Sequence, residues 1–177
     1  MKNKKKYGHI FWITGLSGSG KSAIGKKLKP LIEKKFGKTI VIHGDEIRNI
    51  YKFKSYSKVD RLKIGKANSD LCKLLSKQGI NIIFTTVSLF KELFTYNRKN
   101  LINYKEIYIK TNMKQLLKNK NKPFYKKKTK FVWGIDLSPE YPNKPDIIYY
   151  NKFSEFVGKS AKIIYKKIEN SMSYNKK

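Results

Sequence analysis

Short apolar runs alternate with longer amphipathic stretches along the chain. The runs have the composition of buried β-strands, and the stretches carry apolar residues at helical spacing. Strands are predicted over 9–14, 39–43, 80–87, 106–110 and 146–150, and helices over 22–36, 46–51, 58–77, 89–102, 113–118 and 153–172. Because strands that alternate with helices form parallel β-α-β units, the pattern predicts a three-layer α/β fold with helices on both faces of the sheet.

One segment, 118–130, departs from this alternation. Seven of its thirteen residues are lysine, none is acidic, and Pro123 interrupts any helix. Two interpretations stay open. The segment is either a basic loop without a role or a lid that closes over phosphates, as such loops do in small kinases.

Composition narrows the class of protein. The 177 residues match the length of one domain, so we expect a single domain over 1–177. No run approaches the roughly 18 apolar residues of a membrane-spanning helix, so no membrane partner is expected. The single cysteine, Cys72, cannot form an intramolecular disulfide and indicates a reducing compartment, which predicts a cytoplasmic protein. Since Cys72 lies among leucines of a predicted helix, we interpret it as a packing residue.

The formal net charge is +29, from 41 Lys and Arg against 12 Asp and Glu. Such a charge suggests a nucleic-acid binder. However, only Arg48, Arg61 and Arg98 are arginines, and the enriched types are those that AT-rich codons encode. Two explanations remain: coding bias spread over solvated faces, or attraction of polyanions, anionic nucleotides included. The few arginines are more informative, because a guanidinium can bind a phosphate with two parallel hydrogen bonds.

Residues 15–22 fit the pattern G-x-x-x-x-G-K-[ST] at every defined position. They lie between a predicted strand and a predicted helix, the context that a phosphate-binding P-loop requires. Glycines let several backbone N–H groups converge on one phosphate, and the helix N-terminus adds positive charge. Lys21 can reach the β- and γ-phosphates, and the Ser22 hydroxyl can coordinate Mg²⁺. The predicted nucleotide-binding residues are Gly15, Ser17, Gly18, Ser19, Gly20, Lys21 and Ser22.

A second nucleotide motif is weaker. The run from Asn143 to Asp146 matches the N-K-x-D pattern by which GTPases recognise guanine. In GTPases the pattern follows a buried strand, whereas here it precedes the fifth predicted strand. We interpret the match as chance.

Charged side chains follow the second predicted strand, in the run from His43 to Arg48. Strand ends beside a phosphate-binding loop form the ligand crevice of an open α/β sheet. There Asp45 can orient a substrate hydroxyl and accept its proton, and Arg48 can hold an anionic group of the same substrate. Asp45 could instead cap the next helix. Two interpretations of His43 stay open: a second-sphere group of the site, or a satisfied histidine at a strand end.

Together these residues make the chain resemble adenylylsulphate kinase from about residue 9 to residue 150. The resemblance rests on the P-loop, on Gly44-Asp45 with Arg48, on Asp60-Arg61, on Ser88, and on Gly134-Ile135-Asp136 with Glu140, Pro142, Pro145 and Asp146. It implies a P-loop NTPase fold whose parallel five-stranded sheet has the order 2-3-1-4-5. It also implies an enzyme: a nucleotide kinase that uses ATP and Mg²⁺ to phosphorylate the 3′-hydroxyl of a 5′-activated nucleotide.

The resemblance also implies roles for single residues. Asp45 and Lys21 would be catalytic, with Asp45 the base, and Ser22 would hold the metal. Arg48 and Arg61 would bind the 5′ anionic group, and the lid would contribute Lys122. The residues implied to bind the acceptor nucleotide are Asp45, Arg48, Tyr56, Arg61, Ser88, Lys122, Val132 and Trp133.

Departures from the adenylylsulphate kinase pattern fall on the acceptor side. His43 replaces the first Asp of Asp-Gly-Asp, the lid's Arg-Asp pair is Asn119-Lys120, and Val132 occupies an aromatic position of the base clamp. The runs 85–90 and 96–98 instead resemble the cytidine diphosphoramidate kinases of bacterial capsule phosphoramidate synthesis. That resemblance implies cytidine diphosphoramidate as the acceptor, with adenosine 5′-phosphosulphate as the alternative.

Two further hypotheses remain at this point. A basic P-loop protein could bind nucleic acid and use ATP as a switch, although the chain has no aromatic–basic element such as an RNP motif. The other hypothesis is that the protein is a degenerate, inactive kinase, because its lid has lost the Arg-Asp pair. Whether the protein forms a homodimer also stays open.

Overall fold

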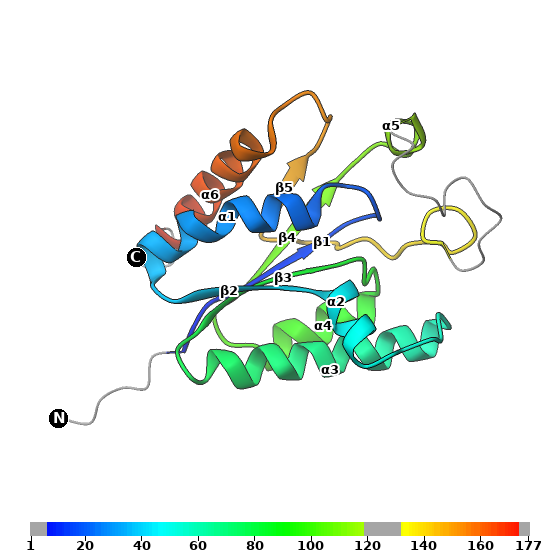
Figure 1. Ribbon diagram of the computed structural model, residues 1–177, viewed down its shortest axis with the longest axis horizontal. Helices are drawn as coiled ribbons and strands as arrows, with labels where there is room; N and C mark the ends of the chain where they lie inside the picture. The colour runs from blue at the N-terminus through cyan, green and yellow to red at the C-terminus, as the bar shows by residue number, and fades with distance from the viewer. Residues whose placement is uncertain (1–6, 119–131, 174–177) are drawn as a thin grey trace.

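The computed structural model describes residues 7–118 and 132–173. Its centre is a sheet of five parallel strands in the order β2-β3-β1-β4-β5, which confirms the predicted order. The strands are β1 (Ile10–Thr14), β2 (Thr39–His43), β3 (Asn81–Thr86), β4 (Tyr104–Lys110) and β5 (Ile147–Tyr150). Because β1 lies in the middle of this order, the loop that follows it lies at the centre of the sheet's carboxyl edge (Figure 1).

Helices cover both faces of the sheet, as predicted, and complete a three-layer α/β fold (Figure 1). One face packs against α1 and α6, and the other against α3 and α4. The helices are α1 (Lys21–Phe36), α2 (Gly44–Ile50), α3 (Lys58–Ser76), α4 (Lys91–Asn100), α5 (Met113–Lys118) and α6 (Val157–Ser173).

The central strand β1 shows why its sequence reads as continuously apolar. Successive side chains of a strand point to opposite faces, and both faces are covered here. Ile10 and Trp12 therefore belong to the core under α3 and α4, whereas Phe11 and Ile13 belong to the core under α1 and α6. All four side chains are fully buried, so either face of the strand tolerates only apolar residues.

Two predicted helices begin too early. The last helix begins at Val157 rather than at 153, because Phe153 has a left-handed backbone (φ 59°) and its N–H donates to Asn151 Oδ1 at 2.9 Å. The fourth helix begins at Lys91 rather than at 89, because Phe90 is extended and packs its ring in the core. Leu89 and Phe90 are therefore core residues, and Phe153 packs against the same core, without being helical.

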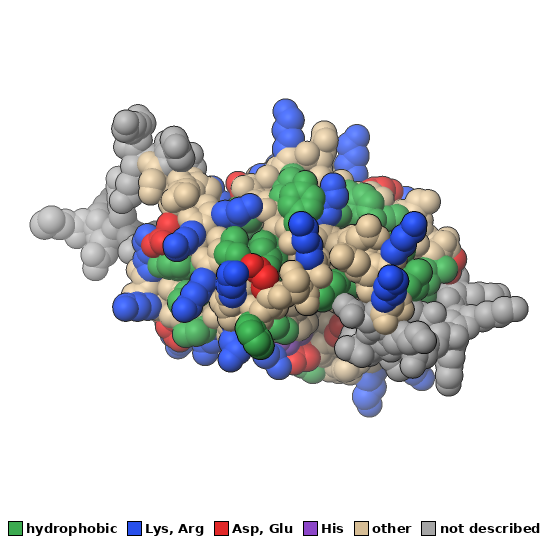
Figure 2. Space-filling view, turned by 90° about the horizontal axis from the view of Figure 1, so that it is seen from above, with side chains coloured by type: hydrophobic (Ala, Val, Ile, Leu, Met, Phe, Trp, Pro, Cys, Tyr) green, Lys and Arg blue, Asp and Glu red, His purple; other side chains and the backbone are tan. Residues whose placement is uncertain are grey.

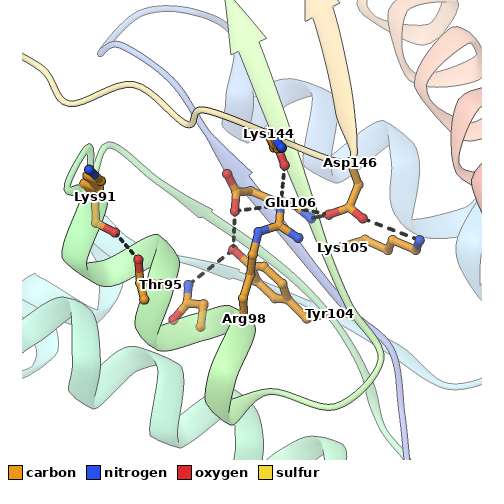
Figure 3. A network of polar contacts seen from close by, with 9 residues as sticks. Lys91, Thr95, Arg98, Tyr104, Lys105, Glu106, Lys144 and Asp146 are labelled. Atoms are coloured by element: carbon orange, nitrogen blue, oxygen red, sulfur yellow. Dashed lines mark hydrogen bonds and ion pairs between the residues drawn. The ribbon is translucent and has the colours of Figure 1, made fainter.

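A network of polar side chains joins α4 to the start of β5 through the buried Glu106 of β4 (Figure 3). Arg98 Nη2 lies 3.2 Å from Glu106 Oε2 and 3.3 Å from Asp146 Oδ2. Asp146 also accepts from the Glu106 N–H at 2.8 Å, and Lys105 Nζ lies 3.5 Å from its other oxygen. Asp146 is thus engaged with β4 and α4, which agrees with a chance match to the guanine-binding pattern.

The same network includes part of the 96–98 run. The Asn97 side chain is buried and bonds to Ser69 Oγ at 2.5 Å, while Tyr96 donates to Asp70 at 2.7 Å. Both contacts join α4 to α3, so these residues connect helices in this chain.

Composition predicted that Cys72 is a packing residue and that no helix spans a membrane. Cys72 is fully buried in the core under α3 and α4, and burial raises the pKa of its thiol, which confirms a packing role. Among the residues that the structure describes, no helix is both long and apolar enough to cross a membrane.

Glu106 should make stability depend on pH. Burial first, and then the charge of Asp146, raise the pKa of Glu106 from its ordinary 4.5 to about 7, against the opposing effect of Arg98. A folded-state pKa above the unfolded one stabilises the protein below about pH 4.5, and that contribution is lost as the pH rises through about 7. We expect the parent to lose on the order of 3 kcal/mol relative to Glu106→Gln across this range.

Chemical denaturation of both proteins at several pH values between 4.5 and 8 measures this difference. Parallel stability curves would show that Glu106 does not titrate in this range.

Candidate active site

The P-loop, residues 15–20, follows β1 and lies against the carboxyl edge of the sheet. A Cβ on Gly15 would lie 2.5 Å from the Ile109 carbonyl oxygen of β4, so only glycine fits there. Gly20, the N-cap of α1, has φ 91°. This is a left-handed backbone conformation that residues with a side chain disfavour. These two positions fix the course of the loop between β1 and α1, and within it the Ser19 N–H donates to the Leu16 carbonyl at 3.1 Å.

Lys21 and Ser22 occupy the first turn of α1. The Lys21 ammonium lies over the loop, because its Nζ donates to the Leu16 carbonyl at 2.7 Å and lies 3.5 Å from Ser19 Oγ. The Ser22 side chain is exposed. A hydroxyl at this position suits Mg²⁺, which takes few protein oxygens and completes its shell with phosphates and water.

Asn151, which sequence reasoning missed, supports the P-loop from the end of β5. Its side chain is nearly buried, and its Nδ2 donates to the Ser19 carbonyl at 3.0 Å. Its other atom, Oδ1, accepts from the Phe153 N–H. The only signal in the sequence was an asparagine directly after the fifth predicted strand, at the edge where ligands bind.

The ends of β2 and β3 lie beside the P-loop and carry Asp45 and Ser88. Asp45 is exposed in the first turn of α2, whose N-cap is His43, so Asp45 is not itself the cap residue. His43 is buried and its Nδ1 lies 2.7 Å from Thr85 Oγ1, so it is the satisfied histidine of the second interpretation. Ser88 shares a hydrogen bond of 2.9 Å with Thr86 Oγ1.

Two guanidinium groups meet at the ring of Tyr56. The Arg48 and Arg61 carbons Cζ lie 4.5 Å and 5.0 Å from the ring centroid, and Arg61 also lies 5.7 Å from that of Trp133. Burial, and then the charge of Arg48, lower the pKa of Arg61. Two like charges at one place form a site that favours an anion.

Backbone carbonyls between α2 and α3 hold these guanidiniums. Arg48 Nη1 donates to the Phe53 and Ser55 carbonyls at 3.0 and 2.9 Å, and Arg61 Nε donates to that of Tyr56 at 2.9 Å. The segment is fixed in turn by Asp60, which accepts from Ser55 and Ser57 hydroxyls at 2.5 and 2.6 Å. These two hydrogen bonds lower the pKa of Asp60, since they favour its charged form.

The turn over 132–137 closes this side of the site. Trp133 is only 5% exposed and packs edge-on against Phe90 at 4.9 Å between centroids, so it supports the wall of the site. Val132 is half-buried, and its N–H donates to Asp136. Gly134 lies so close to Met113 of α5 and Leu16 of the P-loop that a Cβ would collide with Met113. The turn is therefore packed onto the loop.

The structure gathers the predicted residues into two groups along one edge of the sheet. The P-loop residues form the first, and Arg48, Tyr56, Arg61 and Trp133 form the second. Asp45 and Ser88 lie at the strand ends beside them. The proposed lid, with Lys122, lies outside the described residues except for Lys118, the last residue of α5.

This fold and this loop define a P-loop kinase architecture. The family model described as Adenylylsulphate kinase matches residues 7–150. A Campylobacter jejuni protein named Cytidine diphosphoramidate kinase is 34% identical over 172 residues, 95% of this chain and 99% of that protein. A Bacillus velezensis Adenylyl-sulfate kinase is 33% identical over 154 residues, 83% of this chain and 78% of that protein.

Solved structures share the fold. A Mycobacterium tuberculosis APS kinase in complex with AMPPNP and APS superposes with a TM-score of 0.82 over 92% of this chain and 98% of that one, at 24% identity. The chain belongs to the adenylylsulphate kinase family. The predicted family and the predicted class of enzyme, a kinase, are thereby confirmed.

Proposed function

We propose that this protein transfers the γ-phosphoryl group of ATP to the ribose 3′-hydroxyl of cytidine diphosphoramidate. The observation that carries the acceptor is the similarity to the Campylobacter jejuni protein of that name along almost the full length of both chains. The similarity to adenylylsulphate kinases supports the same reaction on a different nucleotide. Since ATP is the donor, the proposal places the reaction in the cytoplasm.

The donor half of the proposal rests on the P-loop. Its backbone N–H groups, together with the N-terminus of α1, suit the β- and γ-phosphates. Lys21 would leave its carbonyl acceptor on Leu16 and bind oxygens of the β- and γ-phosphates, on either side of the P–O bond that breaks. Ser22 would hold Mg²⁺, which would neutralise phosphate charge.

The acceptor half rests on Asp45 and on the two guanidiniums. The 3′ oxygen forms a bond to the γ-phosphorus, the bond from that phosphorus to the bridging oxygen breaks, and ADP leaves with the bond's electron pair. Asp45, exposed at the end of β2, would accept the proton of the hydroxyl. Arg48 and Arg61 would bind the 5′ anionic group and so align the ribose.

Aromatic exposure favours a small base. Tyr56 is 48% exposed, whereas Trp133 is 5% exposed and already packed against Phe90. With Val132 at the other clamp position, one exposed aromatic ring remains among these residues to stack on a base. A pyrimidine needs less stacking surface than adenine.

The distribution of charge argues against a polymer ligand. Figure 2 shows Lys and Arg side chains spread over the visible face, with hydrophobic and other residues between them. A nucleic-acid binder would gather its basic residues in a patch or stripe. On this face the spread supports coding bias as the source of the positive charge.

Removal of the P-loop ammonium should abolish transfer. We expect Lys21→Ala to lower kcat by at least about 100-fold, because the preorganised cation beside the transferred group is lost. A coupled assay of ADP release measures this. Lys26→Ala, which removes an exposed charge from the same helix, should leave kcat unchanged. Turnover of Lys21→Ala within a few-fold of the parent would contradict the donor site.

Asp45→Asn should slow phosphoryl transfer and leave the affinity for ATP unchanged. A positioned base contributes roughly 10²–10⁴-fold, so kcat should fall by that factor. Glu46→Gln, one residue further along α2 and also exposed, is the matched control. Titration with ATP shows whether binding is retained. An equal collapse of ATP binding would assign Asp45 to the metal instead of the hydroxyl.

The parent enzyme should prefer the cytidine acceptor. Stacking of one base on an aromatic ring is worth about 1–3 kcal/mol, which is roughly 5- to 150-fold in kcat/KM. We therefore expect kcat/KM for cytidine diphosphoramidate to exceed that for adenosine 5′-phosphosulphate by a factor in this range. An equal or higher value for the adenosine compound would make the protein an adenylylsulphate kinase, and no turnover of either would indicate an inactive kinase.

A further inference from the structure

We propose that Glu140 is a positioning residue for the acceptor site. Its carboxylate ties the start of α3 and the start of α4 to the segment that follows the 132–137 turn. The inference rests on the proposed function, since it concerns how the acceptor residues are held together.

Each carboxylate oxygen of Glu140 holds a different helix. Oε1 lies 2.8 Å from Lys58 Nζ at the first residue of α3. Oε2 accepts from the Lys91 N–H at 2.8 Å, which satisfies a backbone donor at the first residue of α4. The Glu140 N–H also donates to the Leu89 carbonyl at 3.1 Å, just before α4.

The three segments that Glu140 joins carry several of the residues proposed to bind the acceptor. Tyr56 and Arg61 flank Lys58 in the chain, and Ser88 lies three residues before Lys91. The 132–137 turn contributes Trp133, which Arg61 approaches from α3. No backbone hydrogen-bond ladder connects these segments, since α3, α4 and the turn are separate elements. Apart from the hydrogen bond of the Glu140 N–H to the Leu89 carbonyl, side-chain contacts therefore set the spacing of these segments.

The charge of Glu140 is well suited to both contacts. The hydrogen bonds from Lys58 and from the Lys91 N–H lower its pKa, so it stays ionised at neutral pH. Its side chain is 40% exposed, and an exposed ion pair adds little to global stability. A displacement of the acceptor residues by about 1 Å, in contrast, weakens alignment strongly. Loss of Glu140 should thus appear in acceptor binding more than in stability.

Glu92 provides a matched control. Its carboxylate pairs with Lys66 at 2.6 Å, so it also joins α4 to α3 through an exposed ion pair. No contact joins Glu92 to the described part of the 132–142 segment. Glu92→Ala therefore removes a comparable inter-helix pair while it leaves the third segment alone.

Steady-state kinetics with the acceptor that the parent turns over tests the proposal. We expect Glu140→Ala to raise the acceptor KM about 10-fold, with kcat and the KM for ATP within about 3-fold of the parent. Glu140→Gln keeps an oxygen for the Lys91 N–H and should recover most of this loss. Glu92→Ala should leave all three constants unchanged, and Tm should fall by only about 2–5 °C in Glu140→Ala.

Three outcomes would overturn the positioning role: an unchanged acceptor KM in Glu140→Ala, an equal rise in Glu92→Ala, or a fall in kcat together with equal rises in both KM values. If the parent phosphorylates no nucleotide, the proposed function fails. Hydrogen exchange then tests separately whether Glu140 holds the three segments together. Exchange over 55–62 and 132–141 should then increase in Glu140→Ala and not in Glu92→Ala, and unchanged exchange in both would contradict the proposal.

Discussion

The P-loop backbone approaches the sheet so closely that the rest of the site is built around it. Gly15 faces the Ile109 carbonyl of β4, and Asn151 at the end of β5 holds the Ser19 carbonyl. Because β1 pairs with both β3 and β4, these two neighbours fix the position of the end of β1, where the loop begins. The 132–137 turn then packs onto the loop through Gly134, and α1 begins with Lys21, whose ammonium lies over the loop. A displacement of the loop would therefore disturb every other element of this edge.

The two halves of the site are held by different kinds of interaction. The donor half consists mainly of backbone geometry, which Gly15 and the Asn151 side chain fix. The acceptor half consists of side chains from separate segments. Arg48 lies on α2, Tyr56 in the loop between α2 and α3, Arg61 on α3, and Trp133 on the 132–137 turn. Substitutions there alter recognition without unfolding the loop. This division gives a physical reason why relatives named for different acceptor nucleotides share one fold.

Periodicity and motif spacing were sufficient for the strands and the P-loop, whereas the strand order came from the resemblance to adenylylsulphate kinase. Strands such as β1 are buried on both faces, and the P-loop has a strict local pattern, so both leave a clear signal in the sequence. The start of α6 could not be predicted, because the side chain of Asn151 ends the strand in a turn and the apolar spacing continues past it. The burial of Trp133 and the network around Glu106 depend on contacts between distant segments, which spacing along the chain does not encode.

The convergence of Arg48 and Arg61 at Tyr56 bears on which part of an acceptor supplies its binding energy. The carbonyl acceptors between α2 and α3, fixed by Asp60, hold the two like charges near one ring in the folded protein. The free energy needed to bring them together is therefore spent in folding rather than in binding. Burial, and then the charge of Arg48, lower the pKa of Arg61, and an anion bound there offsets both effects, whereas a neutral group does not. On the proposed function the 5′ anionic group thus dominates affinity, and the exposed face of Tyr56 is left to discriminate between bases.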